Sequence, residues 1–199
     1  ARSRQIRALW AATAIAEGSS MLNRERPFGL PSKLSGTLYV SSMIREIDVI
    51  GFLARKIQKY ECRGSGLNVV TSCQSSGRTC IQDNSLDYVF IDPPFGGNLN
   101  YAELNFLWEQ LLRLQTNVSY EAIESKAHKK TLDDYRRMMT QCFREAFRIL
   151  KPGRWMTVEF SNTQAAVWNA IQTALQEAGF VVANVSALDK KQGSFKAVT

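Results

Sequence analysis

The chain has 199 residues, of which 45% are hydrophobic and 22% are charged, so it suits a globular domain with a core and excludes disorder throughout. It holds no run of eighteen apolar residues and does not open on a secretory pattern, which predicts a soluble cytoplasmic protein with no membrane partner. The formal charge of +7 favours a polyanionic partner such as DNA, although many basic proteins bind no nucleic acid.

Residues 1–66 are expected to form a helical and loop segment that packs on the core or leads into it. Helical spacing of apolar side chains predicts helices over residues 2–18 and 44–60. The stretch between them is rich in proline and glycine, and residues 37–40 predict a short strand.

Strands and helices alternate from residue 67 onward. Strands are predicted at "LNVVTS" (67–72), "LDYVFI" (86–91), "WMTVEF" (155–160) and "FVVANV" (180–185), because these short runs are rich in β-branched or aromatic residues. Helices are predicted around residues 104–112, over 132–150 and over 165–179. The second should turn Tyr135, Met139, Cys142, Phe143 and Ala146 inward, and the third Val167, Ile171 and Leu175.

This alternation predicts an α/β fold with a doubly wound, Rossmann-like parallel sheet and helices on both faces. In such sheets ligands bind beyond the carboxyl ends of the strands. The stretch "VFIDPPFGGNLNY" (89–101) runs off the end of a predicted strand at that position, so it is the first candidate for a functional site.

The residues Asp92 to Phe95 form a rigid group of hydrogen-bond acceptors beside an aromatic ring. Pro93 and Pro94 fix the backbone and donate no hydrogen bond, so their carbonyls stay free to accept. A carboxylate oxygen of Asp92 and the Pro93 carbonyl could bind both hydrogens of one amino group. An exocyclic amino group of a nucleobase has two such hydrogens. The base would have to flip out of the duplex and would then stack on Phe95. The competing interpretation is a strand-ending turn that Asp92 caps.

The rest of this stretch permits several roles. The N-x-x-E spacing of Asn100 and Glu103 favours a helix cap over a pocket residue for Asn100. Asn98 and Tyr101 are candidates for substrate binding and equally for packing. Asn162, beyond the next strand, is expected to cap a helix or to line the same rim.

At these residues the chain resembles the amino-directed DNA methyltransferases. The likeness rests on "IQDNSLDYVFIDPPF", similar to the strand and D-P-P-[YFW] tetrad of that family, and on "AFRILKPGRWMTVEFSN", similar to its next helix, turn and strand. "YAELNFLWEQLL" and "LDKKQGSFKAVT" resemble a subgroup of large prokaryotic DNA methylases. The likeness covers roughly residues 67–199, which would be the C-terminal part of a class I methyltransferase catalytic domain.

The resemblance implies S-adenosylmethionine as cofactor and DNA as partner, as in prokaryotic restriction-modification. It implies that Asp92 and the Pro93 carbonyl bind the target amino group, that Pro94 fixes the loop and that Phe95 stacks on a flipped base. The methyl group would pass by direct displacement, with no metal and no covalent intermediate. Aspartate at the first tetrad position favours adenine within the family.

One departure from the family concerns the cofactor. The F-x-G-x-G loop is not present in this sequence, so the sheet is expected to be incomplete, with its first strands missing, and this chain alone to be an inactive fragment. Ser72 and Gln74, after the predicted strand 67–72, are candidates to bind the cofactor together with Asp92. For Cys73 a buried structural thiol is favoured.

Other functions remain open at this point. Cytosine amino-group or RNA methylation is the nearest alternative, and a non-catalytic nucleic-acid-binding subunit with the same fold is another. Lys129 and Lys130, in a predicted loop, are either solvated surface or DNA contacts. The recognition sequence and the oligomeric state do not follow from the sequence.

Overall fold

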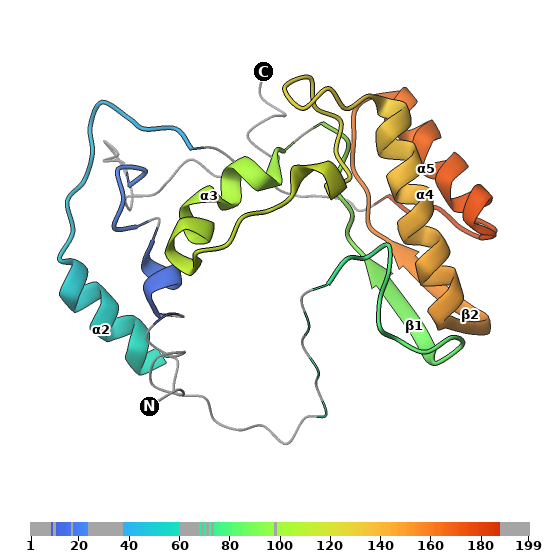
Figure 1. Cartoon of the computed structure of the whole chain (residues 1–199), viewed down its shortest axis with the longest axis horizontal. Coiled ribbons are helices and arrows are strands. Elements are labelled where there is room, and N and C mark those ends of the chain that lie inside the picture. The colour runs from blue at the N-terminus through green and yellow to red at the C-terminus, as the bar shows by residue number, and fades with distance from the viewer. Residues whose placement is uncertain are drawn as a thin grey trace.

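The computed structural model describes residues 9–187 of the chain except residues 10, 17, 24–37, 60–67, 69, 71, 73 and 98. Its elements in chain order are α2 (Val49–Lys59), β1 (Leu86–Ile91), α3 (Tyr101–Leu112), the 3-10 helix η1 (Val118–Tyr120), α4 (Leu132–Ile149), β2 (Leu150–Val158) and α5 (Ala165–Ala178) (Figure 1). Residues 11–15 are also helical.

Strands β1 and β2 form a two-stranded parallel sheet. The first has the predicted bounds, whereas the second begins five residues before the predicted strand 155–160 and ends two residues before its end. Leu86 pairs with Leu150 but Tyr88 pairs with Trp155, so residues 151–154 bulge out of the ladder. Gly153 has φ +73, a conformation that glycine adopts without strain, and it allows the chain to turn there. Beyond the bulge the register is regular as far as Ile91 and Val158.

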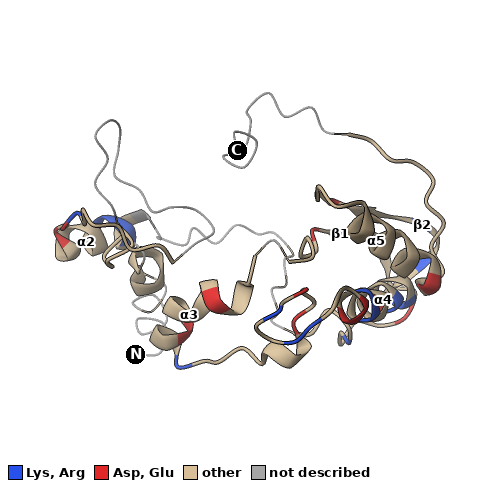
Figure 2. Ribbon diagram, turned by 90° about the horizontal axis from the view of Figure 1, so that it is seen from above, with Lys and Arg blue, Asp and Glu red and all other residues tan. Residues whose placement is uncertain are grey.

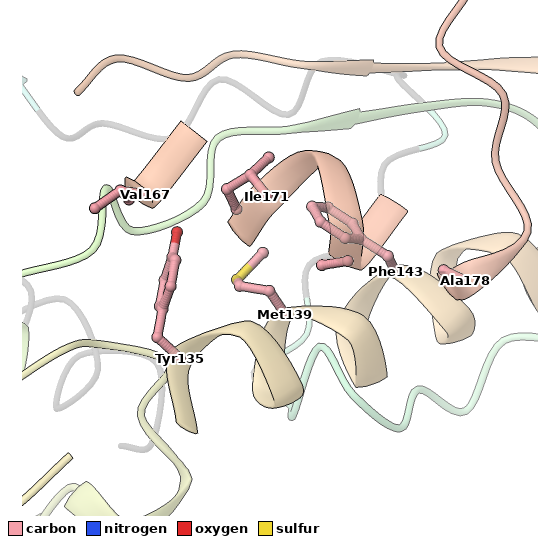
Figure 3. Close-up of a cluster of buried hydrophobic side chains, with 7 residues drawn as sticks. Tyr135, Met139, Phe143, Val167, Ile171 and Ala178 are labelled. Carbon is pink, nitrogen blue, oxygen red and sulfur yellow. The ribbon is translucent and has the colours of Figure 1, made fainter. Parts of the chain in front are cut away.

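Helices α4 and α5 pack against each other and enclose the main hydrophobic cluster (Figure 3). Its buried members come from the predicted inward faces of the two helices. They are Tyr135, Met139, Phe143, Val167, Ile171, Ala174 and Ala178. Cys142 and Leu175, expected to point inward, are only half-buried. Ile91, Met156 and Val158 pack against this cluster from the sheet, so one face of the sheet lies on the core.

The opposite face of the sheet is exposed in the described structure. Tyr88, Phe90 and Trp155 expose 54%, 58% and 65% of their surface. The structure is therefore mixed α/β with a small parallel sheet, and within the described residues only one sheet face is covered by packed helices.

Several predicted elements differ from the structure. Residues 180–185 form no strand, and Val181 is 88% exposed, since among the described residues no strand pairs with them. Residues 38–40 form no strand either, and the same holds for residues 68, 70 and 72, the described part of the predicted strand 67–72. Helix α3 forms as predicted but contains no buried residue.

Candidate active site

Asp92 is the first residue after β1, at the carboxyl end of the sheet. The ladder extends to this edge, where the Glu159 amide donates to the Ile91 carbonyl at 2.9 Å. Asp92 is exposed and Pro93 is buried. Within the described part of the chain, neither the Asp92 carboxylate nor the Pro93 carbonyl takes part in a hydrogen bond. Both groups thus lack a hydrogen-bond partner among the described residues, and their binding of a substrate amino group stays a prediction.

The next carbonyl, that of Pro94, is bound from α4. The Tyr135 hydroxyl donates to it at 2.6 Å, and the Tyr135 side chain is fully buried. Figure 3 shows this ring projecting from α4 with its oxygen at the far end. Burial raises the pKa of the Tyr135 hydroxyl well above its ordinary value, and a hydrogen bond from the Gly96 backbone opposes that rise only in part. The hydroxyl therefore stays protonated and acts as a donor.

The Phe95 carbonyl is bound by a side chain that follows β2. Asn162 donates to it from Nδ2 at 2.8 Å, while Asn162 Oδ1 accepts from the Gln164 amide at 2.7 Å. The second contact fixes which end of the carboxamide faces Phe95, because only the Nδ2 end donates. Asn162 thus lies beside the Asp92–Phe95 loop, at the edge of the sheet where one of its two predicted roles places it. Its Oδ1 accepts from the backbone amide of Gln164, the residue just before α5.

The ring of Phe95 packs in a row of edge-to-face aromatic contacts. Its centroid lies 5.2 Å from that of Phe160, which lies 4.9 Å from that of Trp168. The indole N–H of Trp168 donates to the Asn162 carbonyl at 2.9 Å. Phe95 as a whole residue is half-buried, and the stacking of a base on its ring stays a prediction.

Tyr101, the first residue of α3, interacts electrostatically with the Asp92 carboxylate. Burial raises the pKa of the Tyr101 hydroxyl, and the negative charges of Asp92 and Glu121 raise it further. The role of Tyr101 in substrate binding stays a prediction. Asn98 lies outside the described residues.

The predicted cap by Asn100 is wrong. Asn100 occupies the N-cap position of α3 but its side chain makes no capping hydrogen bond. Glu121 takes this role from another loop, since its Oε1 accepts from the Ala102 amide at 3.1 Å. The fold places the Glu121 carboxylate at the Ala102 amide, so this amide at the start of α3 is bound by Glu121 and not by the Asn100 side chain.

An open groove of about 410 Å³ borders the Asp92–Phe95 loop on the side of Gly97. Its lining residues include Asn100, Glu124, Lys126 and Gln164. Lys126 is exposed there, and Lys129 is exposed three residues further along the chain. The Lys130 ammonium, in contrast, donates to the carbonyls of Val118 and Glu121.

The two remaining predicted cofactor residues, Ser72 and Gln74, precede β1 in the chain. The Gln74 side chain accepts from the Cys80 amide at 3.1 Å, in the segment that leads into β1. Ser72 is exposed and Cys73 lies outside the described residues. The role of Ser72 and Gln74 in cofactor binding stays a prediction.

Tyr135 and Glu121 were not predicted as parts of the site. Helical spacing placed Tyr135 in the core, and the one available signal was that a buried tyrosine hydroxyl needs a partner. The described residues contain no helix long and apolar enough to cross a membrane and no cluster of three or more His, Cys, Asp or Glu side chains able to hold a metal ion.

The sequence also matches a known protein family. Residues 86–199, more than half of the chain, match the family model described as DNA methylase, which defines the class of protein. The chain belongs to the N6/N4 DNA methylase family, whose members methylate amino groups of DNA bases. The two-stranded sheet with α4 and α5 is consistent with part of a methyltransferase fold. No curated protein and no solved structure matches the chain.

Proposed function

We propose that this protein methylates the exocyclic amino group of adenine in DNA, with S-adenosylmethionine as methyl donor. The observation that carries the proposal is the pair of free acceptors at the carboxyl end of β1, the exposed Asp92 carboxylate and the Pro93 carbonyl. Family membership supports an amino group of DNA as the target. Prokaryotic restriction-modification is the setting that this activity suits.

The two acceptors suit an amino nitrogen that must become nucleophilic. The lone pair of an exocyclic amine is delocalised into the base, and two hydrogen bonds from its N–H groups favour a tetrahedral nitrogen with a localised pair. The new N–C bond would form as the sulfonium–methyl bond of the donor breaks and leaves a neutral thioether. The nitrogen would then hold one proton too many, which the Asp92 carboxylate can accept and pass to solvent. Phe95 would stack on the base, worth about 1–3 kcal/mol.

A base inside a duplex cannot reach these groups. Asp92 lies at the rim next to the half-buried Phe95, so the target base must leave the stack at a cost of a few kcal/mol. The groove beside Gly97 would receive adjoining parts of the strand. Tyr101 and Asn98 lie on the following segment and are proposed to contact the base.

The acceptors at the rim also fit the positively charged end of S-adenosylmethionine, which supplies an activated methyl group when bound. Asp92 would face that charge, and Ser72 and Gln74 remain candidates for its adenosine part. The F-x-G-x-G loop is not in this sequence, so in this proposal other residues of the protein supply it and residues 1–199 act as the half that binds the target base.

The proposal is tested with the full-length protein, S-adenosylmethionine and DNA, followed by nucleoside analysis. We expect N6-methyladenine, and we expect Asp92→Ala and Asp92→Asn to lower kcat by about 100-fold or more, the loss typical of one preorganised polar group. A variant that keeps the wild-type rate would refute the role of Asp92. N4-methylcytosine in the DNA, or methylation of RNA alone, would refute adenine as the target.

A second candidate function is a non-catalytic nucleic-acid-binding subunit, favoured by the absence of the F-x-G-x-G stretch from this sequence. Titration of the full-length protein with S-adenosylmethionine separates the two. Saturable binding supports the enzyme, and no measurable binding together with retained DNA affinity supports the subunit.

A further inference from the structure

We infer that Tyr135 and Asn162 are positioning residues that select the Pro93 carbonyl as the free acceptor of the site. This inference rests on the proposed function, because it concerns how the acceptors for the target amino group are held. Neither residue touches the reacting atoms in this proposal.

The need for such residues follows from the two prolines. A loop is normally fixed through both its N–H and its C=O groups, but Pro93 and Pro94 have no N–H. The backbone of Pro93 and Pro94 can therefore be held by hydrogen bonds only through their carbonyls, by donors that come from other parts of the chain. Each carbonyl that receives a donor is fixed, and each that receives none is left for a ligand.

The structure supplies donors to three consecutive carbonyls. Pro94 receives the Tyr135 hydroxyl at 2.6 Å, Phe95 receives Asn162 Nδ2 at 2.8 Å, and Gly96 receives the Glu124 amide at 3.4 Å. The two short bonds come from side chains of separate elements, one on α4 and one after β2. Pro93, the carbonyl just before this run, has no donor among the described residues.

Both donors are themselves held firmly. Tyr135 is fully buried, so its hydroxyl has few alternatives to Pro94. Asn162 is held at Oδ1 by the Gln164 amide and at its carbonyl by the Trp168 indole. A donor with a single available orientation fixes the carbonyl that it binds, and a displacement of about 1 Å near reacting atoms lowers a rate by about 100-fold.

The experiment compares wild-type full-length protein with Tyr135→Phe and Asn162→Asp, each of which removes one donor at almost unchanged volume. We expect kcat for DNA methylation to fall about 10- to 100-fold while the Kd for DNA changes less than about twofold, because the acceptors shift but the DNA-binding surface does not. Matched controls are Tyr120→Phe, at a residue 81% exposed, and Asn169→Asp, on the exposed side of α5, which should keep the wild-type kcat.

Hydrogen exchange of the Gly96 and Glu124 amides gives a readout that does not depend on activity. Both donor-deleting variants should exchange these amides about tenfold faster or more, with little change at the amides of α5. An unchanged kcat and unchanged exchange in these variants would overturn the inference, as would equal changes throughout the protein, which indicate general destabilisation. If wild type does not methylate DNA, the proposed function fails, and the exchange rates alone then decide whether the carbonyls are held as inferred.

Discussion

The Glu145 carboxylate joins two segments that are distant in sequence. Its Oε1 accepts from the Thr79 amide at 2.6 Å and from the Thr79 hydroxyl at 2.7 Å, and the Arg148 guanidinium pairs with both of its oxygens. Hydrogen bonds from Arg148 lower the pKa of Glu145 to about 2, and those from Thr79 add to the effect. The loop before β1 is thereby fixed to the end of α4.

This lowered pKa predicts a dependence of stability on pH. The folded pKa of about 2 lies below the ordinary value near 4.3, so the contribution of Glu145 is complete above about pH 5 and is lost as the pH falls towards 2. Glu145→Gln should lower Tm at pH 6 to 7, and the difference from wild type should shrink between pH 4.5 and 2.5. Thermal unfolding followed by circular dichroism measures this difference.

A suitable control is Glu159→Gln, because Glu159 is exposed and has no ion pair among the described residues. Its effect on Tm should be small and constant with pH. A Tm difference for Glu145→Gln that does not vary with pH would contradict the assigned electrostatic origin.

At the scale of elements, α5 ends through a left-handed glycine. Gly179 has φ +101, its amide donates to the Gln176 carbonyl, and the Phe180 amide donates to the Leu175 carbonyl. This arrangement satisfies carbonyls that the end of a helix leaves free. A Cβ at residue 179 would lie 3.3 Å from the ring of Phe147.

Gly179→Ala should therefore destabilise the protein by more than the backbone strain alone. That strain is about 1–2 kcal/mol for an L-residue in the left-handed region. Gly153→Ala is the matched control, since Gly153 has φ +73 but a Cβ at that residue would meet no described atom within 4 Å. Urea unfolding should give a lower free energy of unfolding for Gly179→Ala than for Gly153→Ala. The reverse order would show that the contact of the new Cβ with Phe147 does not destabilise the protein.

The elements that the sequence predicts well are those defined by local patterns. Helix α4 has an inward face that repeats at helical spacing and a capping box at Thr131 and Asp134, so both its start and its buried side could be predicted. Residues 180–185 have the composition of a strand, but a strand forms only beside a partner, which composition does not reveal. For α3, spacing predicted which residues share a face but not whether anything covers that face.

The same distinction applies to the candidate site. Asp92 to Phe95 could be predicted because the prolines and the preceding strand are neighbours in sequence. The donors to their carbonyls come from residues 41 and 67 positions away, and no local pattern links them to the loop. The cap of α3 by Glu121 was missed for the same reason, because Asn100 satisfied the local rule.

At the scale of the whole molecule, much of the positive charge on α4 is balanced locally. Figure 2 shows basic and acidic positions mixed along this helix. Arg136 pairs with Asp133 and Glu177, and Arg148 pairs with Glu145. Lys126, which lines the groove, and Lys129 are in contrast exposed, and neither has an acidic partner among the described residues. These two lysines are therefore the better candidates for contact with DNA phosphates.

Replacement of both lysines by alanine should weaken DNA binding and make it less sensitive to salt. Each lost phosphate contact should lower the slope of log Kd against log salt concentration by about 0.9. Fluorescence anisotropy with a labelled duplex at several salt concentrations measures the slope in the full-length protein. Arg144→Ala, at an exposed arginine of α4, should leave the slope unchanged. An unchanged slope in the double lysine variant would exclude these residues from the DNA contact.

The distant anchors of the Asp92–Phe95 loop also set an order of events during synthesis. Phe95 is made 67 residues before Asn162, which corresponds to about 3 to 13 s at a translation rate of about 5–20 residues per second. The Pro94 carbonyl lacks its donor until Tyr135 is made 41 residues later, and the Phe95 carbonyl lacks its donor until Asn162 is made. The two acceptors therefore reach their working geometry only when Asn162 has left the ribosome, so a nascent chain truncated before that residue would contain the whole D-P-P-F sequence without a formed site.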